Sequence, residues 1–185
     1  MNEICAIVDI QGFNFKDRFV ARELAICSDV ITQCQELNPK IYWRSLTPEE
    51  QELIKHTTKF VNGLYYAPFN PVEHAFLPHS DDVGVLLKSY YDLVASPEKP
   101  KFAFKNQFLK PILDKENIPY IDLDDIQYNI PSINTIENIF GNNYACGYHK
   151  KPPRDGSNIA YRCAYRKTNH LWRYLKNKEN TEQRL

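Results

Sequence analysis

The 185-residue chain contains no run of the roughly 18–20 apolar residues that a membrane-spanning helix needs. We also expect no signal peptide, because a strand-like run begins almost at once, at Ile4. Its five cysteines are an odd number without a secretory signal, which argues against a disulfide framework and for a reducing compartment. We therefore expect an intracellular protein, in the cytoplasm, the nucleus or both.

Internal repeats, low-complexity tracts and the sharp turn that exposes a catalytic serine are also missing. Cys146 and His149 could form a nucleophilic pair, but no third group that would orient the histidine can be placed beside them. With 25% charged and 13% aromatic residues, the composition is that of a globular domain. The length predicts one domain, residues 1–176, followed by a flexible polar tail, residues 177–185.

Apolar patterning and turn residues predict an α/β fold. Strands are predicted over residues 4–10, 18–27, 30–36, 101–105 and 118–123, and helices over about 47–62, 80–95, 106–115, 131–141 and 158–176. Short connections between the first three strands indicate an antiparallel meander. The later strand, helix and strand form a βαβ unit, which makes part of the sheet parallel. We therefore expect a mixed sheet flanked by helices.

Charge is distributed unevenly along a chain whose formal net charge is zero. Residues 147–185 hold ten Lys or Arg against three Asp or Glu, a balance of +7, so residues 1–146 carry −7. Basic residues interleaved with aromatic ones favour contact with phosphates and stacked bases. The predicted nucleic-acid contacts are Arg162, Tyr165, Arg166, Trp172, Arg173 and Lys176. The alternative is an amphipathic helix whose basic face is simply solvated.

The same region contains a pattern of potential metal ligands, Cys146-x2-His149-x13-Cys163-x6-His170. Two ligands separated by two residues can bind one ion from a tight turn, and a later helix can supply the others. Cys163 and His170 are two helical turns apart and would share a face. The pattern predicts one structural zinc ion; the alternative is a chance spacing of a buried cysteine and a surface histidine. We expect Cys5, Cys27 and Cys34 to be small core residues.

The order of elements resembles that of the RNase H-like exonucleases of the DEDD (DnaQ-like) type. The segment from Val8 to Phe13 is similar to their first motif, but Gln11 stands where the second acid would be. The segment from Phe104 to Lys110 resembles their second motif, with Lys105 and Lys110 in place of its histidine and acid. Those enzymes hold two divalent metals about 4 Å apart with roughly four carboxylates. Asp9 alone cannot do so, and we expect the exonuclease mechanism to be absent.

A closer resemblance is to the Maelstrom domain of the germline piRNA pathway, a DnaQ-like fold that has lost these carboxylates and carries a Glu-Cys-His-Cys zinc set. The segment from Phe19 to Ile26 looks like the family's glutamate-bearing strand. The resemblance implies Glu23, Cys146, His149 and Cys163 as ligands, whereas spacing alone offers His170 as the fourth. This chain departs from the family in a longer gap between His149 and Cys163, and we expect it to lack the HMG box that some family members carry before the domain.

The resemblance implies a zinc-stapled, catalytically degenerate module that binds single-stranded nucleic acid, RNA rather than DNA, in small-RNA or transposon silencing. Two alternatives stay open. One is a ribonuclease that works without the DEDD carboxylates and even without metal. The other is a protein-interaction scaffold in a silencing complex.

Overall fold

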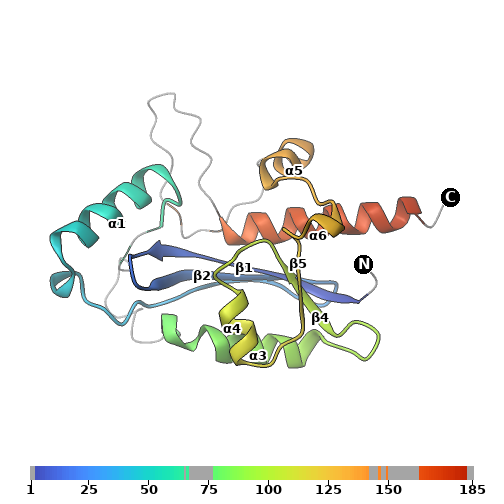
Figure 1. Ribbon diagram of the computed structural model, residues 1–185, viewed down its shortest axis with the longest axis horizontal. Coiled ribbons are helices and arrows are strands. Elements are labelled where there is room, and N and C mark those ends of the chain that lie inside the picture. The colour runs from blue at the N-terminus through green and yellow to red at the C-terminus, as the bar shows by residue number, and fades with distance from the viewer. Residues whose placement is uncertain are drawn as a thin grey trace.

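The computed structural model describes residues 3–64, 66, 77–141, 146, 149 and 163–182. Its centre is a five-stranded mixed sheet in the order β3-β2-β1-β4-β5 (Figure 1). The strands are β1 (Ile4–Asn14), β2 (Phe19–Cys27), β3 (Thr32–Glu36), β4 (Lys101–Phe104) and β5 (Tyr120–Asp122). Strands β1, β2 and β3 pair antiparallel, while β4 runs parallel to β1 and β5 runs parallel to β4. The predicted meander and the predicted parallel βαβ unit are both confirmed.

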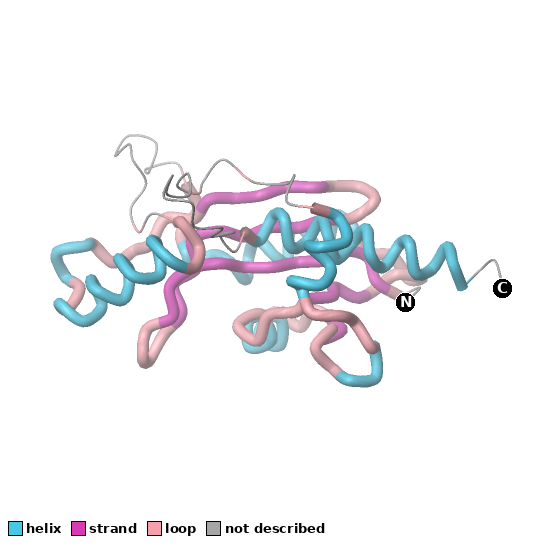
Figure 2. Tube along the Cα trace, turned by 90° about the horizontal axis from the view of Figure 1, so that it is seen from above, coloured by secondary structure: helices cyan, strands magenta, loops and turns pink. Residues whose placement is uncertain are grey.

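Helices cover both faces of this sheet. They are α1 (Pro48–Phe60), α3 (Val83–Val94), α4 (Lys110–Lys115), α5 (Ile133–Phe140) and α6 (Ala164–Glu182), with short 3-10 turns at Trp43–Ser45, Ser80–Asp82 and Ile126–Tyr128. Figure 1 shows α3 and α4 on one face, α5 and α6 on the other, and α1 beyond one end of the sheet. Seen from above, α6 runs along the strands (Figure 2). The predicted α/β class, a mixed sheet flanked by helices, is confirmed.

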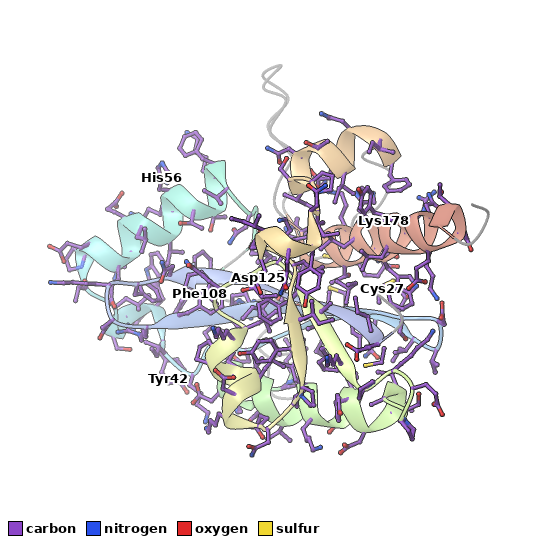
Figure 3. The ribbon with its side chains drawn as sticks, turned by 45° about the vertical axis from the view of Figure 1, so that its right-hand side comes forward. Cys27, Tyr42, His56, Phe108, Asp125 and Lys178 are labelled. Atoms are coloured by element: carbon purple, nitrogen blue, oxygen red, sulfur yellow. The ribbon has the colours of Figure 1, made fainter. Side chains whose placement is uncertain are left out.

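The apolar run of β1 is continuous because the strand is buried on both faces. On the side of α3 and α4, Val8 and Ile10 pack in one cluster with Leu87 and Leu113. On the opposite side, Ile7 belongs to a second cluster that contains residues from α5 and α6, including Leu171. Figure 3 shows side chains filling the space on both sides of the sheet. A third cluster, which includes Phe13 and Ile54, joins the far end of β1 to α1.

Several predicted boundaries shift for identifiable reasons. The strand predicted from Val30 begins at Thr32, because the Ser28 hydroxyl accepts hydrogen bonds from the N–H groups of Val30 and Ile31 and makes a turn there. The helix predicted from Asn106 begins at Lys110. Asn106 itself makes a turn, in which its side-chain oxygen accepts the Phe108 N–H at 3.1 Å. Thr47 and Glu50, by contrast, form the predicted capping box at the start of α1.

Helix α6 differs from its predicted range at both ends. Residues 158–162 at its predicted beginning lie outside the described residues, and the described helix starts at Ala164. At the other end it continues to Glu182, six residues beyond the predicted end at Lys176, so residues 177–182 of the predicted tail are helical. Three of these six residues, Lys178, Glu179 and Glu182, are straight-chain polar types, which lose little rotamer freedom in a helix. The Thr181 hydroxyl adds a hydrogen bond to the Asn177 carbonyl at 2.9 Å.

Candidate metal centre

Glu23 is a fully buried carboxylate in the middle of β2, with an exposed fraction of 0%. A buried carboxylate without compensating partners is costly, so its two oxygens need donors or a cation. The neighbouring arginines are engaged elsewhere: Arg18 pairs with Glu50 at 2.5 Å and Arg22 pairs with Glu36 at 2.8 Å. Glu23 is therefore neither an exposed edge residue nor the ion-pair partner of Arg18 or Arg22.

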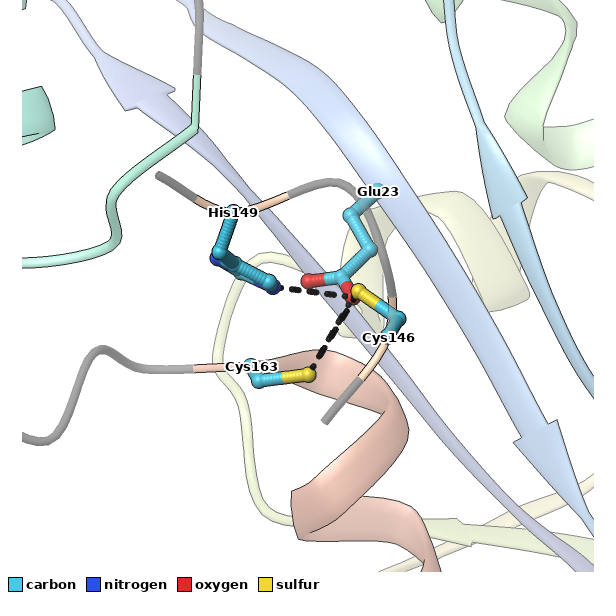
Figure 4. A group of neighbouring side chains, drawn as sticks. All are labelled: Glu23, Cys146, His149 and Cys163. Atoms are coloured by element: carbon cyan, nitrogen blue, oxygen red, sulfur yellow. Dashed lines mark hydrogen bonds and ion pairs between the residues drawn. The ribbon is translucent and has the colours of Figure 1, made fainter. Parts of the chain in front are cut away.

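The two carboxylate oxygens of Glu23 face different groups. Oε2 accepts the backbone N–H of Ala164, the first residue of α6, at 2.9 Å. Oε1 lies 2.8 Å from Cys146 Sγ, 3.3 Å from His149 Nε2 and 3.4 Å from Cys163 Sγ (Figure 4). One ligand atom from each of these four residues lies within 4.8 Å of every other. This group, the ligand cluster, could hold one metal ion.

The spacing within the ligand cluster is close to that of a tetrahedral site. For Zn–S of about 2.3 Å and Zn–N or Zn–O of about 2.0–2.1 Å, tetrahedral geometry separates two sulfurs by about 3.8 Å and a nitrogen and an oxygen by about 3.3 Å. The sulfurs of Cys146 and Cys163 are 3.7 Å apart, and His149 Nε2 is 3.3 Å from Glu23 Oε1. The contact of 2.8 Å between Cys146 Sγ and Glu23 Oε1 is clearly shorter than a tetrahedral edge.

The backbone around Asn62 orients the His149 ring. His149 Nδ1 contacts the backbone carbonyl of Asn62, and because a carbonyl only accepts, this nitrogen carries the hydrogen. Nε2 is then the ring atom that faces the ligand cluster, at 3.3 Å from Glu23 Oε1. A histidine that binds a metal usually donates its second ring N–H in this way. His149 also bridges to Leu64, and the Asn62 side chain links Leu64 to Gly12 of β1 with hydrogen bonds of 3.0 and 2.9 Å.

Cys163 immediately precedes α6, and its Sγ accepts the backbone N–H of Arg166 at 3.5 Å. Free N–H groups and the helix dipole at a helix N-terminus favour a thiolate, the form that binds metals. The start of α6 thus contributes twice to the site, through the sulfur of Cys163 and through the N–H of Ala164 on Glu23.

In the ligand cluster, protons and a divalent cation compete for the same ligand atoms. The hydrogen bond with Cys146 and burial raise the pKa of Cys163 far above that of a free thiol. Burial opposes the charge of the His149 ring, yet hydrogen bonds to Cys163 and Glu23 outweigh it and raise the pKa of His149 to about 10. Without a metal, protons therefore hold the cluster together. A divalent cation takes the place of such protons when it binds.

His170, the alternative fourth ligand, does not belong to the ligand cluster. A separation of seven residues places it about 10.5 Å farther along α6 than Cys163, although on the same face. There its ring is buried beside Phe140, with the ring centroids 5.8 Å apart, and burial lowers its pKa. The prediction of His170 as a ligand is wrong because a shared face does not imply a shared end of the helix.

Two of the three cysteines in the sheet are buried core residues, as predicted. Cys5 and Cys27 are buried, and Cys27 faces α6, where its Sγ lies 3.8 Å from Asn169 Oδ1 (Figure 3). Cys34 is only partly buried, and its Sγ lies 3.2 Å from Glu23 Oε1. Sequence reasoning missed this proximity, because it depends on the register that sets Ala25 of β2 opposite Cys34 of β3.

The positions that resemble the exonuclease motifs form a second polar group on the same face of the sheet. Asp9 is fully buried and accepts hydrogen bonds from Gln11 at 3.1 Å and from Asn106 at 2.9 Å. The ammonium group of Lys167 lies 3.1 Å from Asp9 Oδ1 and donates to the Lys105 carbonyl at 2.5 Å. We call Asp9, Gln11, Asn106 and Lys167 the Asp9 cluster.

Cys163 and Lys167 are one helical turn apart, so α6 serves both clusters with one face. Burial raises the pKa of Asp9, although Lys167 and the two amides oppose that effect. The Lys105 side chain pairs instead with Asp124 at 2.5 Å, and Lys110 is exposed at the start of α4.

The predicted nucleic-acid contacts on α6 divide into buried and open positions. Arg162 lies outside the described residues. Arg166 is buried, with an exposed fraction of 7%, and pairs with Glu137 of α5 at 2.9 Å, so the prediction that it lies on an open face is wrong. Packing of α5 on α6 is the reason. Tyr165 and Trp172 are partly buried.

Two of the predicted cations remain toward solvent on this helix. Arg173 is exposed and lies over the Phe140 ring at 4.7 Å. Lys176 is partly exposed, lies over the Trp172 ring at 4.8 Å and pairs with Asp29 at 2.7 Å. Within the described residues of α6, the open basic surface is therefore smaller than the predicted set of contacts suggests.

The chain matches no protein-family model, and no curated protein is similar enough to count as a relative. None of the helices in the described part of the chain has the length and apolar character required to cross a membrane.

Proposed function

We propose that the ligand cluster binds one zinc ion with a structural role. The observation that supports this most directly is the convergence of two sulfurs, one imidazole nitrogen and one carboxylate oxygen at near-tetrahedral spacing. Two thiolates and an imidazole suit zinc better than magnesium or calcium, which prefer oxygen ligands. Four protein ligands leave no open position for water or substrate, as in structural zinc sites.

The proposed zinc joins segments that are distant in sequence. Glu23 lies in β2, Cys146 and His149 lie between α5 and α6, and Cys163 begins α6. An ion at this point fastens the start of α6 to the sheet, and its binding free energy becomes folding free energy. The same helix supplies Lys167 to the Asp9 cluster, so the zinc also stabilises that contact.

We further propose an RNase H-like domain of the Maelstrom type that lacks two-metal catalysis. The strand order, with an antiparallel meander beside two parallel strands, supports the fold, and the Glu-Cys-His-Cys set supports the closer relationship. Against catalysis stands Lys167: its ammonium group lies beside Asp9 and repels a divalent cation there. One carboxylate and one lysine cannot assemble a pair of metals.

The role we propose for such a domain is binding of single-stranded nucleic acid, with RNA favoured. Arg173 and Lys176, with the Trp172 ring just before Arg173 in sequence and beneath the Lys176 ammonium group, offer phosphate contacts and a stacking surface on the outer side of α6. Each lost phosphate contact flattens the salt dependence of binding by about 0.7 per charge for a single strand.

Metal analysis tests the zinc. Native mass spectrometry of purified protein is expected to show one zinc per chain, and a chelator is expected to lower the melting temperature. Protein that is folded and free of zinc would contradict the proposal.

Titration of a 20-nucleotide RNA over a salt series tests the binding role, with Arg173→Glu/Lys176→Glu compared with wild type. Lys55→Glu/Lys59→Glu on the distant helix α1 is the matched control. Equal affinity and salt slope in all three proteins would exclude the α6 surface and favour the scaffold alternative. RNA cleavage that persists in EDTA would favour the ribonuclease.

A further inference from the structure

Cys34 is a fifth potential ligand at the edge of the ligand cluster. Its strand, β3, is the outer strand of the sheet beside β2. The Cys34 thiol donates to Glu23 Oε1 at 3.2 Å, the same oxygen that lies 2.8 Å from Cys146 Sγ. Cys27, on the same face, lies instead beside Asn169, so contact with the cluster is not general among the sheet cysteines.

Glu23 has a role that does not depend on metal. Its Oε2 accepts the N–H of Ala164 at 2.9 Å and so caps α6. Only Oε1 faces the cluster, which makes Glu23 a ligand through one oxygen. The carboxylate can therefore release an ion and still cap the helix.

Replacement of the Glu23 carboxylate by the Cys34 thiolate as a metal ligand has a chemical basis. Sulfur ligands are favoured over oxygen by soft and borderline ions, and Cys3His sets are common in structural zinc sites. Cys34 is not among the residues whose ligand atoms all lie within 4.8 Å of one another, so it cannot bind at the same time as Glu23 without moving. Rotation about χ1 between staggered wells is the movement that a cysteine side chain has available.

We propose that Cys34 is a reserve ligand of the metal site, which replaces Glu23 as the fourth ligand. In the exchange, the bond from the metal to Glu23 Oε1 breaks and a bond from the metal to Cys34 Sγ forms. The thiol proton of Cys34 passes to Glu23 Oε1 along the hydrogen bond that already joins them. The result is a Cys3His set, and the inference rests on the zinc site proposed above.

X-ray absorption at the zinc edge tests the exchange, because it separates sulfur neighbours at about 2.3 Å from nitrogen or oxygen neighbours at about 2.0–2.1 Å. The key variant is Glu23→Gln, whose amide oxygen can still accept the Ala164 N–H but is a poor ligand. We expect two sulfur neighbours in wild type and three in Glu23→Gln. In Glu23→Gln/Cys34→Ser the zinc affinity should fall by at least roughly 10–100-fold. That is the usual cost of removing a residue that supports a metal ligand.

Glu23→Gln/Cys27→Ser is the matched control and should keep three sulfur neighbours. If Glu23→Gln shows two sulfurs, or loses zinc as readily as the double variant with Cys34→Ser, the reserve ligand is excluded while the zinc site stands. If wild type binds no zinc, both proposals fall.

A second measurement leaves Glu23 in place and decides the matter if Glu23→Gln does not fold. Cadmium is softer than zinc and should recruit Cys34 in the wild-type protein. X-ray absorption is then expected to find three sulfur neighbours in wild type and two in Cys34→Ser. Two in both proteins would overturn the proposal.

Discussion

Replacing Lys167 by methionine tests the most unusual pairing in the structure. Asp9 has an exposed fraction of 0%, and the Lys167 side chain has one of 15%. Methionine fills similar volume but removes the cation, so Asp9 is left buried with a charge and only two amide donors, Gln11 and Asn106.

The expected cost follows from the burial of the pair. Removing one partner of a buried ion pair costs about 3–5 kcal/mol, because the other charge stays uncompensated. We expect the lower end, about 3 kcal/mol at pH 7, since the two amides still donate to the carboxylate. In the double variant Asp9→Asn/Lys167→Met no charge is stranded, and the loss should be smaller than in Lys167→Met by about 1–3 kcal/mol.

The loss should also depend on pH in a defined direction. Burial raises the pKa of Asp9, and the nearby Lys167 ammonium group opposes that rise. Without the lysine, the pKa of Asp9 in the folded protein rises further above its value in the unfolded chain. The folded state then binds the proton more tightly, so stability increases as the pH falls below neutral. The destabilisation by Lys167→Met should therefore be largest at pH 7 and shrink toward pH 4–5.

Urea denaturation at pH 7 and pH 5 measures these quantities, with Lys178→Met on the same helix as control (Figure 3 labels Lys178). Lys178 is three helical turns beyond Lys167, about 16 Å along the axis. A loss below about 1 kcal/mol in Lys167→Met, equal to that of the control and independent of pH, would refute the argument, since exposed ion pairs contribute that little.

Three further predictions concern the metal site, the chemistry and the helix cap. Cys163→Ala should lose zinc and lower the melting temperature by far more than Cys27→Ala, as measured by metal analysis and circular dichroism, because a structural zinc site supplies folding free energy. The protein should not shorten a labelled oligonucleotide in the presence of magnesium. Magnesium-dependent shortening that is abolished by the Asp9→Ala substitution would contradict the proposal that Lys167 repels a divalent cation from Asp9. Thr47→Ala should cost about 1 kcal/mol in denaturant unfolding through loss of the α1 cap, and no change would show that the capping box contributes nothing.

Much of the fold could be predicted from local patterns. The capping box at Thr47 depends on contacts within one turn, and the meander follows from short connections between strand-like runs. The residue types at Cys146, His149 and Cys163 also predicted a metal site, because two ligands separated by two residues can bind one ion from a tight turn and a later helix can supply another.

The choice between Glu23 and His170 as the fourth candidate ligand, and the neighbours of Asp9, required the tertiary structure. Glu23 is 123 positions from Cys146, and Lys167 is 158 positions from Asp9. Sequence periodicity reports which face of a helix a residue occupies, but not which end of it meets the sheet. That difference separates His170 from the site. Periodicity also did not predict that Arg166 points inward to Glu137, because the packing of α5 on α6 depends on the whole fold. Local sequence therefore determined the elements and the type of metal site, and the packing of α6 on the sheet decided which residues form it.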